Sequence, residues 1–179
     1  MVGEPIFLIG YRCTGKTTTG KHIARILGRP FMDTDRQLEA DAGTTITRMV
    51  ETQGWDYFRS EETRTLQKLD LSNAPVVATG GGIILAEENR DFIKKNGLVA
   101  WLTADPATIL ERLGSDAATA DSRPGLTEDN SLEEETKDML QMREPLYREL
   151  ASLIINTADH APEAAAQLII RKLAKETQR

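Results

Sequence analysis

IFLIGYRCTGKT, residues 6–17, is the stretch that decides the fold: a strand-length apolar run, then G-x-x-x-x-G-K-[ST], then helix-forming residues. A glycine-rich turn that leads into a helix N-terminus points backbone N–H groups at a phosphate chain, which is typical of nucleoside triphosphate sites. In such a loop Lys16 reaches the β- and γ-phosphates and the Thr17 hydroxyl holds Mg²⁺. A glycine-rich turn without a ligand is the alternative. We expect the nucleotide to bind at Arg12, Cys13, Thr14, Gly15, Lys16 and Thr17.

The composition is that of one globular domain with an acidic surface. The 179 residues are 40% hydrophobic, enough for one well-buried core and short for two, so we expect a single domain over residues 1–179. The formal net charge of −6 and the lack of a basic stripe argue against a nucleic acid or an anionic membrane as partner. A monomer is the default expectation.

Cysteine usage and the apolar runs indicate the compartment. Cys13 is the only cysteine, so no intrachain disulfide can form, and we find no signal-peptide pattern at the N-terminus. The longest apolar runs, 6–9 and 76–78, have the length of strands and are far too short to span a bilayer. These features predict a cytoplasmic protein without a membrane segment.

Apolar strand-like segments alternate with helix-patterned stretches along the chain, which is typical of βαβ units and of a parallel sheet covered on both faces. Helix starts are marked by Asp105 before Pro106 and by a capping box at Ser131 and Glu134. The pattern predicts an α/β fold. We expect strands at 5–9, 30–33, 75–79, 98–102 and 152–156, and helices at 16–28, 35–42, 45–71 with a break near Gly54, 86–96, 105–113, 131–150 and 161–176.

Residues 34–73 and 114–130 depart from simple alternation. The first region puts a long, charged and mostly helical stretch between two strands, where a crossover needs only about a dozen residues. We expect its helices to form a substrate-binding wall. The second region is rich in Gly, Ser, Ala, Asp and Thr, which suits a mobile lid; an ordinary surface loop is the alternative.

Two carboxylates follow the short strand at 30–33. Asp33 and Asp35 lie at the carboxyl edge of the predicted sheet, where open α/β folds bind ligands. Two residues apart in an extended segment, they would point the same way, one toward the water shell of Mg²⁺ and the other toward a substrate hydroxyl. Capping of the next helix by either residue is the alternative.

A triple glycine and three arginines are further candidates for ligand binding. Gly80, Gly81 and Gly82 directly follow a strand and leave backbone N–H groups uncovered, so that a ligand can approach closely; a simple turn usually needs one glycine. A guanidinium group binds carboxylate or phosphate through two parallel hydrogen bonds, although a single arginine is most often a solvated surface charge. The arginines are Arg59, Arg123 and Arg143.

Taken together and in order, these motifs resemble the shikimate kinase family. The resemblance covers essentially the whole chain and is greatest to the second of the two enterobacterial isozyme types. That family phosphorylates the 3-hydroxyl of shikimate with Mg-ATP in aromatic amino-acid biosynthesis. The resemblance implies a P-loop kinase fold of three α/β/α layers, with a five-stranded parallel sheet in the order 2-3-1-4-5. It rests on the phosphate-binding loop, Asp33-x-Asp35, Phe58-Arg59, the triple glycine, Arg123-Pro124, and Arg143 with Tyr147.

The resemblance also implies a role for each candidate residue. Asp35 would hydrogen-bond the shikimate hydroxyls and act as the base, while Lys16 and Arg123 stabilise the transferring phosphoryl group. Asp33 would join Thr17 in placing Mg²⁺. The substrate would be held by Asp35, Arg59, Gly80, Gly81, Gly82 and Arg143.

Two more positions bear on the nucleotide. The resemblance implies that Arg112 lies against the adenine of ATP, and that Arg123 closes over the phosphates from the lid. Family loops commonly have glycine where Cys13 stands. This loop must therefore avoid a positive φ at Cys13 or tolerate some strain there.

Two alternative functions would also use a phosphate-binding loop. A kinase of the same fold that acts on gluconate or on a nucleoside monophosphate is disfavoured, because Asp35, Arg59, Gly81 and Arg143 suit a small hydroxylated carboxylate better than a nucleobase. A nucleotide-dependent switch without acceptor chemistry is also disfavoured. The sequence contains no Asn-Lys-x-Asp guanine-reading motif, and the expected catalytic positions are all present.

Overall fold

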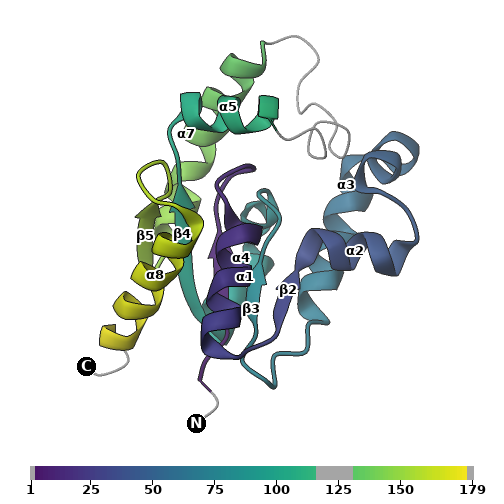
Figure 1. Cartoon of the computed structure of the whole chain (residues 1–179). Coiled ribbons are helices and arrows are strands. Elements are labelled where there is room, and N and C mark those ends of the chain that lie inside the picture. The colour runs from purple at the N-terminus through teal and green to yellow at the C-terminus, as the bar shows by residue number, and fades with distance from the viewer. Residues whose placement is uncertain (1–2, 116–130, 177–179) are drawn as a thin grey trace.

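The computed structural model describes residues 3–115 and 131–176, and a five-stranded sheet lies at its centre (Figure 1). Each pair of neighbouring strands is parallel. The strand order is β2-β3-β1-β4-β5, so the predicted fold class and sheet order are confirmed. The strands are β1 (Ile6–Ile9), β2 (Phe31–Asp33), β3 (Val76–Ala78), β4 (Leu98–Thr103) and β5 (Leu153–Asn156).

Helices cover both faces of this sheet. In Figure 1, α1 and α8 lie in front of the sheet, α4 lies behind it, and α2 and α3 extend to the side beyond β2. The arrangement gives the three layers expected of a P-loop kinase. The helices are α1 (Lys16–Leu27), α2 (Thr34–Ala42), α3 (Ile46–Gln67), α4 (Glu87–Asn96), α5 (Pro106–Ser115), α7 (Leu132–Leu150) and α8 (Pro162–Glu176), with a 3₁₀ turn, η1 (Ile83–Leu85).

The central strand β1 shows why the sheet is covered on both sides. All four of its residues are apolar and buried, and their side chains alternate between two core clusters. Ile6 and Leu8 pack in the cluster that α1 and α8 complete. Phe7 and Ile9 pack in the cluster on the other face, against side chains of α3, α4 and α7. A strand that is apolar on both faces requires two helical layers.

The end of α3 differs from the prediction by four residues, whereas the other predicted helix bounds lie within two residues of the observed ones. The residue pattern predicts a helix to residue 71, but α3 ends at Gln67. The N–H group of Lys68 bonds to the carbonyl of Thr65, only three residues back, at 3.2 Å, which tightens the last turn. Asp70 then accepts a hydrogen bond from the Ser72 N–H group at 3.0 Å and starts a turn.

The other predicted helix signals are confirmed. Gly54 interrupts α3 with φ 84 and ψ 171, outside the helical region. Ser131 and Glu134 form the capping box at the start of α7. Asp105 caps α5 by accepting a hydrogen bond from the Thr108 N–H group at 2.9 Å.

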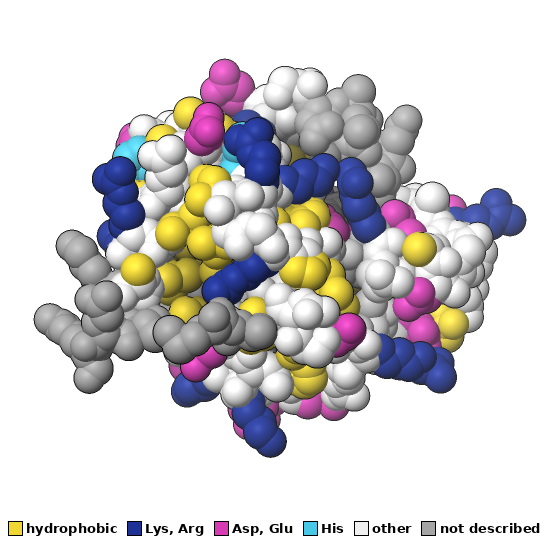
Figure 2. Space-filling view, turned by 60° about the horizontal axis from the view of Figure 1, so that its bottom comes forward, with side chains coloured by type: hydrophobic (Ala, Val, Ile, Leu, Met, Phe, Trp, Pro, Cys, Tyr) yellow, Lys and Arg dark blue, Asp and Glu magenta, His cyan; other side chains and the backbone are white. Residues whose placement is uncertain are grey.

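The surface carries charges of both signs. Figure 2 shows one face of the molecule, on which Lys and Arg side chains are interspersed with Asp and Glu rather than joined in a continuous stripe. Among the helices of the described residues, none is both long enough and apolar enough to cross a membrane.

Candidate active site

The phosphate-binding loop connects β1 to α1. Gly10 has a φ of 142, and a Cβ atom there would collide with the carbonyl oxygen of Leu102, so the position requires glycine. Lys16 Nζ donates hydrogen bonds to the carbonyl oxygens of Gly10 at 2.9 Å and of Tyr11 at 2.7 Å. The Lys16 ammonium group is therefore held over the loop, where phosphate oxygens can replace these carbonyls, and the N-terminus of α1 favours an anion at the same place.

Cys13 has a φ of 58, in the left-handed region that favours glycine. Of the two outcomes left open by the sequence, the loop tolerates strain, at a cost of about 1–2 kcal/mol for an L-residue. The carbonyl oxygen of Cys13 accepts a hydrogen bond from Arg112 Nη1 at 3.2 Å. This bond helps to hold the strained conformation in place.

The conformation of Cys13 can be tested by unfolding experiments. We expect Cys13→Val to lower the free energy of unfolding by about 1–2 kcal/mol, because a β-branched residue at positive φ is a genuine outlier. Cys13→Gly should equal or exceed the wild-type stability, since glycine adopts this φ without strain. Urea denaturation measures both, with Cys13→Ser as the size-matched control. Equal stabilities for the Val and Gly variants would contradict the left-handed conformation.

Arg112 links α5 to two loops at the carboxyl edge of the sheet. Besides Cys13, its guanidinium group bonds to Thr157 through the hydroxyl oxygen at 3.1 Å and the carbonyl oxygen at 2.8 Å. The Thr157 hydroxyl in turn donates to the carbonyl of Thr14 at 3.0 Å. The structure thus brings Arg112 beside the phosphate-binding loop, while its contact with the adenine stays a prediction.

The two candidate metal ligands lie together. Thr17 Oγ1 donates a hydrogen bond to Asp33 Oδ2 at 2.8 Å. A hydroxyl and a carboxylate oxygen side by side form the kind of hard oxygen pair that Mg²⁺ prefers. The residues present therefore fit a Mg²⁺ ion at the end of the phosphate-binding loop.

Asp33 and Asp35 do not point the same way, which corrects the expectation for an extended segment. The strand β2 ends at Asp33, and Asp35 lies in the first turn of α2. Asp33 also caps α2, since its Oδ1 accepts a hydrogen bond from the Arg36 N–H group at 3.3 Å. The turn from strand to helix separates the two carboxylates. Asp33 faces Thr17, and Asp35 lines the neighbouring acceptor pocket.

The acceptor pocket encloses about 500 Å³ of space, including its open mouth, and lies beside the phosphate-binding loop. Trp55 and Phe58 supply apolar walls, and five charged side chains converge on the pocket. The charged residues are Arg12, Asp35, Arg59, Glu62 and Arg143.

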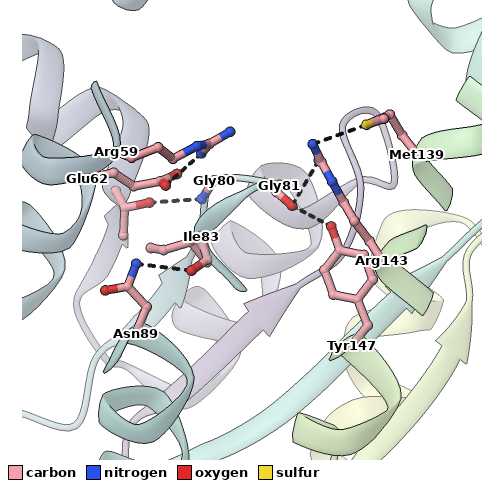
Figure 3. A network of polar contacts seen from close by, with 10 residues as sticks. Arg59, Glu62, Gly80, Gly81, Ile83, Asn89, Met139, Arg143 and Tyr147 are labelled. Atoms are coloured by element: carbon pink, nitrogen blue, oxygen red, sulfur yellow. Dashed lines mark hydrogen bonds and ion pairs between the residues drawn. The ribbon is translucent and has the colours of Figure 1, made fainter. Parts of the chain in front are cut away.

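The triple glycine lines the acceptor pocket, in the turn between the side chains of α3 and those of α7 (Figure 3). The Gly80 N–H group donates to Thr34 Oγ1 at 2.9 Å, and a methyl group on Gly80 would lie 2.6 Å from Asp35 Oδ1 and 2.7 Å from Glu62 Oε1. A side chain at this position would therefore displace both carboxylates. Figure 3 shows Arg59 and Glu62 on one side of this turn and Arg143 and Tyr147 on the other.

Arg59 is fixed by a buried acid and by aromatic rings. Its Nη1 bonds to Glu62 Oε2 at 2.7 Å, and its Cζ lies 5.4 Å from the ring centroid of Trp55 and 4.9 Å from that of Phe58. Glu62 is only 2% exposed. Burial raises the pKa of Glu62 to about 7, opposed by the Arg59 guanidinium and reinforced by the negative charge of Asp35.

Arg143 is a buried cation without a bonded acid in the described part of the chain. It is 4% exposed, and its Nη1 donates to the carbonyl of Gly81 at 3.4 Å. Its Nε is buried and has no hydrogen-bond partner among residues 3–115 and 131–176. The Tyr147 hydroxyl donates to the same carbonyl, and burial raises the pKa of Tyr147, so the hydroxyl keeps its proton. A buried guanidinium with a free donor is suited to an anionic ligand.

The structure brings most of the predicted site residues to one edge of the sheet. Arg123 and most of the predicted lid at 114–130 lie outside the described residues, and residues 114 and 115 belong to α5. Three further residues were not predicted from the sequence: Glu62, and Tyr11 and Glu135, which both contact Arg12. Glu62 had a usable signal, since it follows Arg59 by three residues on one helix; the other two are recognisable only from tertiary contacts.

Comparison with known proteins agrees with this geometry. A family model described as Shikimate kinase matches residues 12–174. Shikimate kinase 2 of Enterobacter sp. (strain 638) is 42% identical over 170 residues, which cover 95% of this chain and 95% of that protein. A solved structure of shikimate kinase from Acinetobacter baumannii in complex with shikimate is 37% identical, with a TM-score of 0.91 over 99% of this chain and 96% of that chain.

A second solved structure, shikimate kinase from Bacteroides thetaiotaomicron, is 29% identical, with a TM-score of 0.84 over 96% of this chain and 98% of that chain. The matches in sequence and in structure thus both extend over nearly the full length. The chain therefore belongs to the shikimate kinase family.

Proposed function

We propose that this chain transfers the γ-phosphoryl group of ATP to the 3-hydroxyl of shikimate through the side chains described above. The overall reaction and the use of ATP and Mg²⁺ follow from membership of the shikimate kinase family. Arg143 is the single observation that best supports the residue assignment. A buried cation that lines the acceptor pocket, and that has no acid partner among the described residues, favours an acceptor that brings a carboxylate.

Arg143 and Arg59 hold the shikimate carboxylate in this proposal. They approach the glycine turn from α7 and α3, and both line the same pocket. Each guanidinium offers a fork of donors that matches a carboxylate. The uncovered backbone of Gly80, Gly81 and Gly82 lets the ring of the substrate lie close to the chain.

Asp35 acts as the base at the opposite end of the acceptor. Its carboxylate takes the proton of the 3-hydroxyl as that oxygen bonds to the γ-phosphorus and the bond to the β–γ bridging oxygen breaks, which releases ADP. Lys16 stabilises the charge on the phosphoryl oxygens. Thr17 and Asp33 would hold Mg²⁺, which supplies further charge neutralisation on the β- and γ-phosphates.

Two further arginines and the helical region complete the proposed site. Arg112 lies against the adenine, and Arg123 acts on the phosphoryl group from a lid at 114–130. Residues 34–73 form the substrate wall within a single domain.

We further propose a cytoplasmic monomer, supported by the single cysteine, Cys13, and by the lack of long apolar segments in the sequence.

The reaction is tested by measuring ADP release from Mg-ATP with shikimate, gluconate, AMP or no acceptor. Release that depends on shikimate supports the proposal. Equal release without any acceptor would indicate a nucleotide-dependent switch, and release with AMP or gluconate alone would indicate a different kinase.

Shikimate binding should depend on pH through Glu62, whose pKa is raised to about 7 by burial. The ionised form competes with the substrate carboxylate for Arg59, so the bound anion raises this pKa further and binding takes up a proton near neutral pH. We expect the shikimate affinity to fall by up to about tenfold as the pH rises from about 6 to about 8.

Calorimetric titration in buffers of different ionisation enthalpy measures the proton uptake. Glu62→Gln should abolish it, whereas Glu61→Gln, a neighbouring residue on the same helix that lies outside this pocket, should not. Proton uptake that persists in Glu62→Gln would assign the titration to another group.

A further inference from the structure

Arg12 connects the two binding sites. Its backbone belongs to the phosphate-binding loop, whereas its side chain lines the acceptor pocket. The side chain is 10% exposed, and its Nη2 forms an ion pair with Glu135 Oε1 at 2.7 Å. The guanidinium group of a loop residue therefore lies in the acceptor pocket.

Glu135 belongs to the helix face that also builds the acceptor site. It lies eight residues before Arg143 and twelve before Tyr147 on α7, a spacing that puts all three on one side of the helix. Arg143 and Tyr147 contact the carbonyl of Gly81, and Glu135 contacts Arg12. The helix α7 thus contacts both the phosphate-binding loop and the glycine turn.

Arg12 keeps donor capacity after pairing with Glu135. Its Nε is buried and finds no hydrogen-bond partner within the described part of the chain, and its Cζ lies 5.4 Å from the centroid of the Tyr11 ring. The Cζ of Arg143 lies 5.6 Å from the same ring. A buried N–H group that finds no protein acceptor carries a desolvation cost that an oxygen-rich ligand would remove.

We propose that Glu135 is a positioning residue that holds the Arg12 guanidinium at the donor–acceptor boundary, where Arg12 binds the phosphoryl group during its transfer. This inference rests on the phosphoryl transfer proposed above.

The test compares Glu135→Gln and Arg12→Lys with the control Glu133→Gln. Glu133 lies on the same helix but is exposed and pairs with Lys137. We expect both test variants to lower kcat about tenfold or more, because small misplacements of reacting groups have effects of this size. The Kd of shikimate, titrated without nucleotide, should stay within about twofold of wild type, since Asp35 and Arg143 are intact. The control should match wild type in both.

Each outcome decides a separate question. Wild-type kcat in folded Glu135→Gln would overturn the positioning role, and a weakened shikimate Kd with unchanged kcat would place Arg12 in acceptor binding instead. If Glu135→Gln fails to fold, as judged by thermal unfolding, Arg12→Lys still tests the guanidinium, because it retains the charge beside Glu135 and loses only the planar fork. A wild-type protein that is inactive with shikimate would refute the proposed function itself, independently of Arg12.

Discussion

Asp35→Asn is expected to lower kcat by about 10²–10⁴-fold while ATP still binds, the range over which a positioned base contributes to proton transfer. Asparagine keeps the shape of the side chain but cannot accept the hydroxyl proton. Asp35 lies in the first turn of α2 and lines the acceptor pocket, whereas the candidate metal ligands, Thr17 and Asp33, face each other at the end of the phosphate-binding loop. Loss of the Asp35 charge should therefore affect the chemical step and leave the nucleotide site intact.

Two measurements separate this effect from misfolding. The Kd of ATP should remain within about threefold of wild type, and Asp41→Asn, an exposed change on the same helix, should leave kcat unchanged. Near-normal kcat in Asp35→Asn would show that Asp35 is not the base. A large loss of ATP affinity with little change in kcat would instead assign the residue to the nucleotide side.

The fold could be predicted because its main signals are local. The apolar run 6–9, buried on both faces, requires a central parallel strand, and the glycine-rich loop after it requires a helix. The error in direction for Asp33 and Asp35 came from treating both as extended. Asp33 ends the strand and caps the helix at once, so the chain turns between the two carboxylates.

The site was predicted as a set of residues but not as a set of partners. Glycines and arginines at the ends of strands and helices could be recognised one by one, since each residue type has its own chemistry. Their partners lie far away in the chain: Arg12 and Glu135 are 123 positions apart, and Arg143 and Gly81 are 62 apart. Only packing of α7 against the sheet brings such pairs together, and no local pattern encodes it.

The raised pKa of Glu62 could not be predicted either, because it depends on burial. Glu62 reads as an ordinary helical acid in the sequence, yet the glycine turn and the α3 environment bury it to 2% exposure beside Arg59 and raise its pKa to about 7. The carboxylate consequently becomes a group that titrates at working pH. The proton uptake that we expect on substrate binding therefore depends on the folded pocket and not on the motif.

Arg143→Lys is expected to raise the KM for shikimate about 100-fold, equivalent to about 3 kcal/mol of lost charge-assisted hydrogen bonding. Arg143 is buried, donates to the Gly81 carbonyl, lines the acceptor pocket and has a further donor without a partner among the described residues. Lysine has one ammonium group and cannot donate to Gly81 and to both oxygens of a carboxylate in a fixed plane. The KM for ATP should change little, because Lys16 and Thr17 are unaltered.

Steady-state kinetics with both substrates measures this effect, and Arg148→Lys provides the control one turn further along α7. Arg148 is exposed and pairs with Glu144, so its replacement should leave both KM values unchanged. Tyr147→Phe, which removes only the hydroxyl that contacts Gly81, should have a smaller effect than Arg143→Lys, since no charge is lost. A larger effect for Tyr147→Phe would mean that Arg143 serves to shape the glycine turn rather than to bind the carboxylate directly.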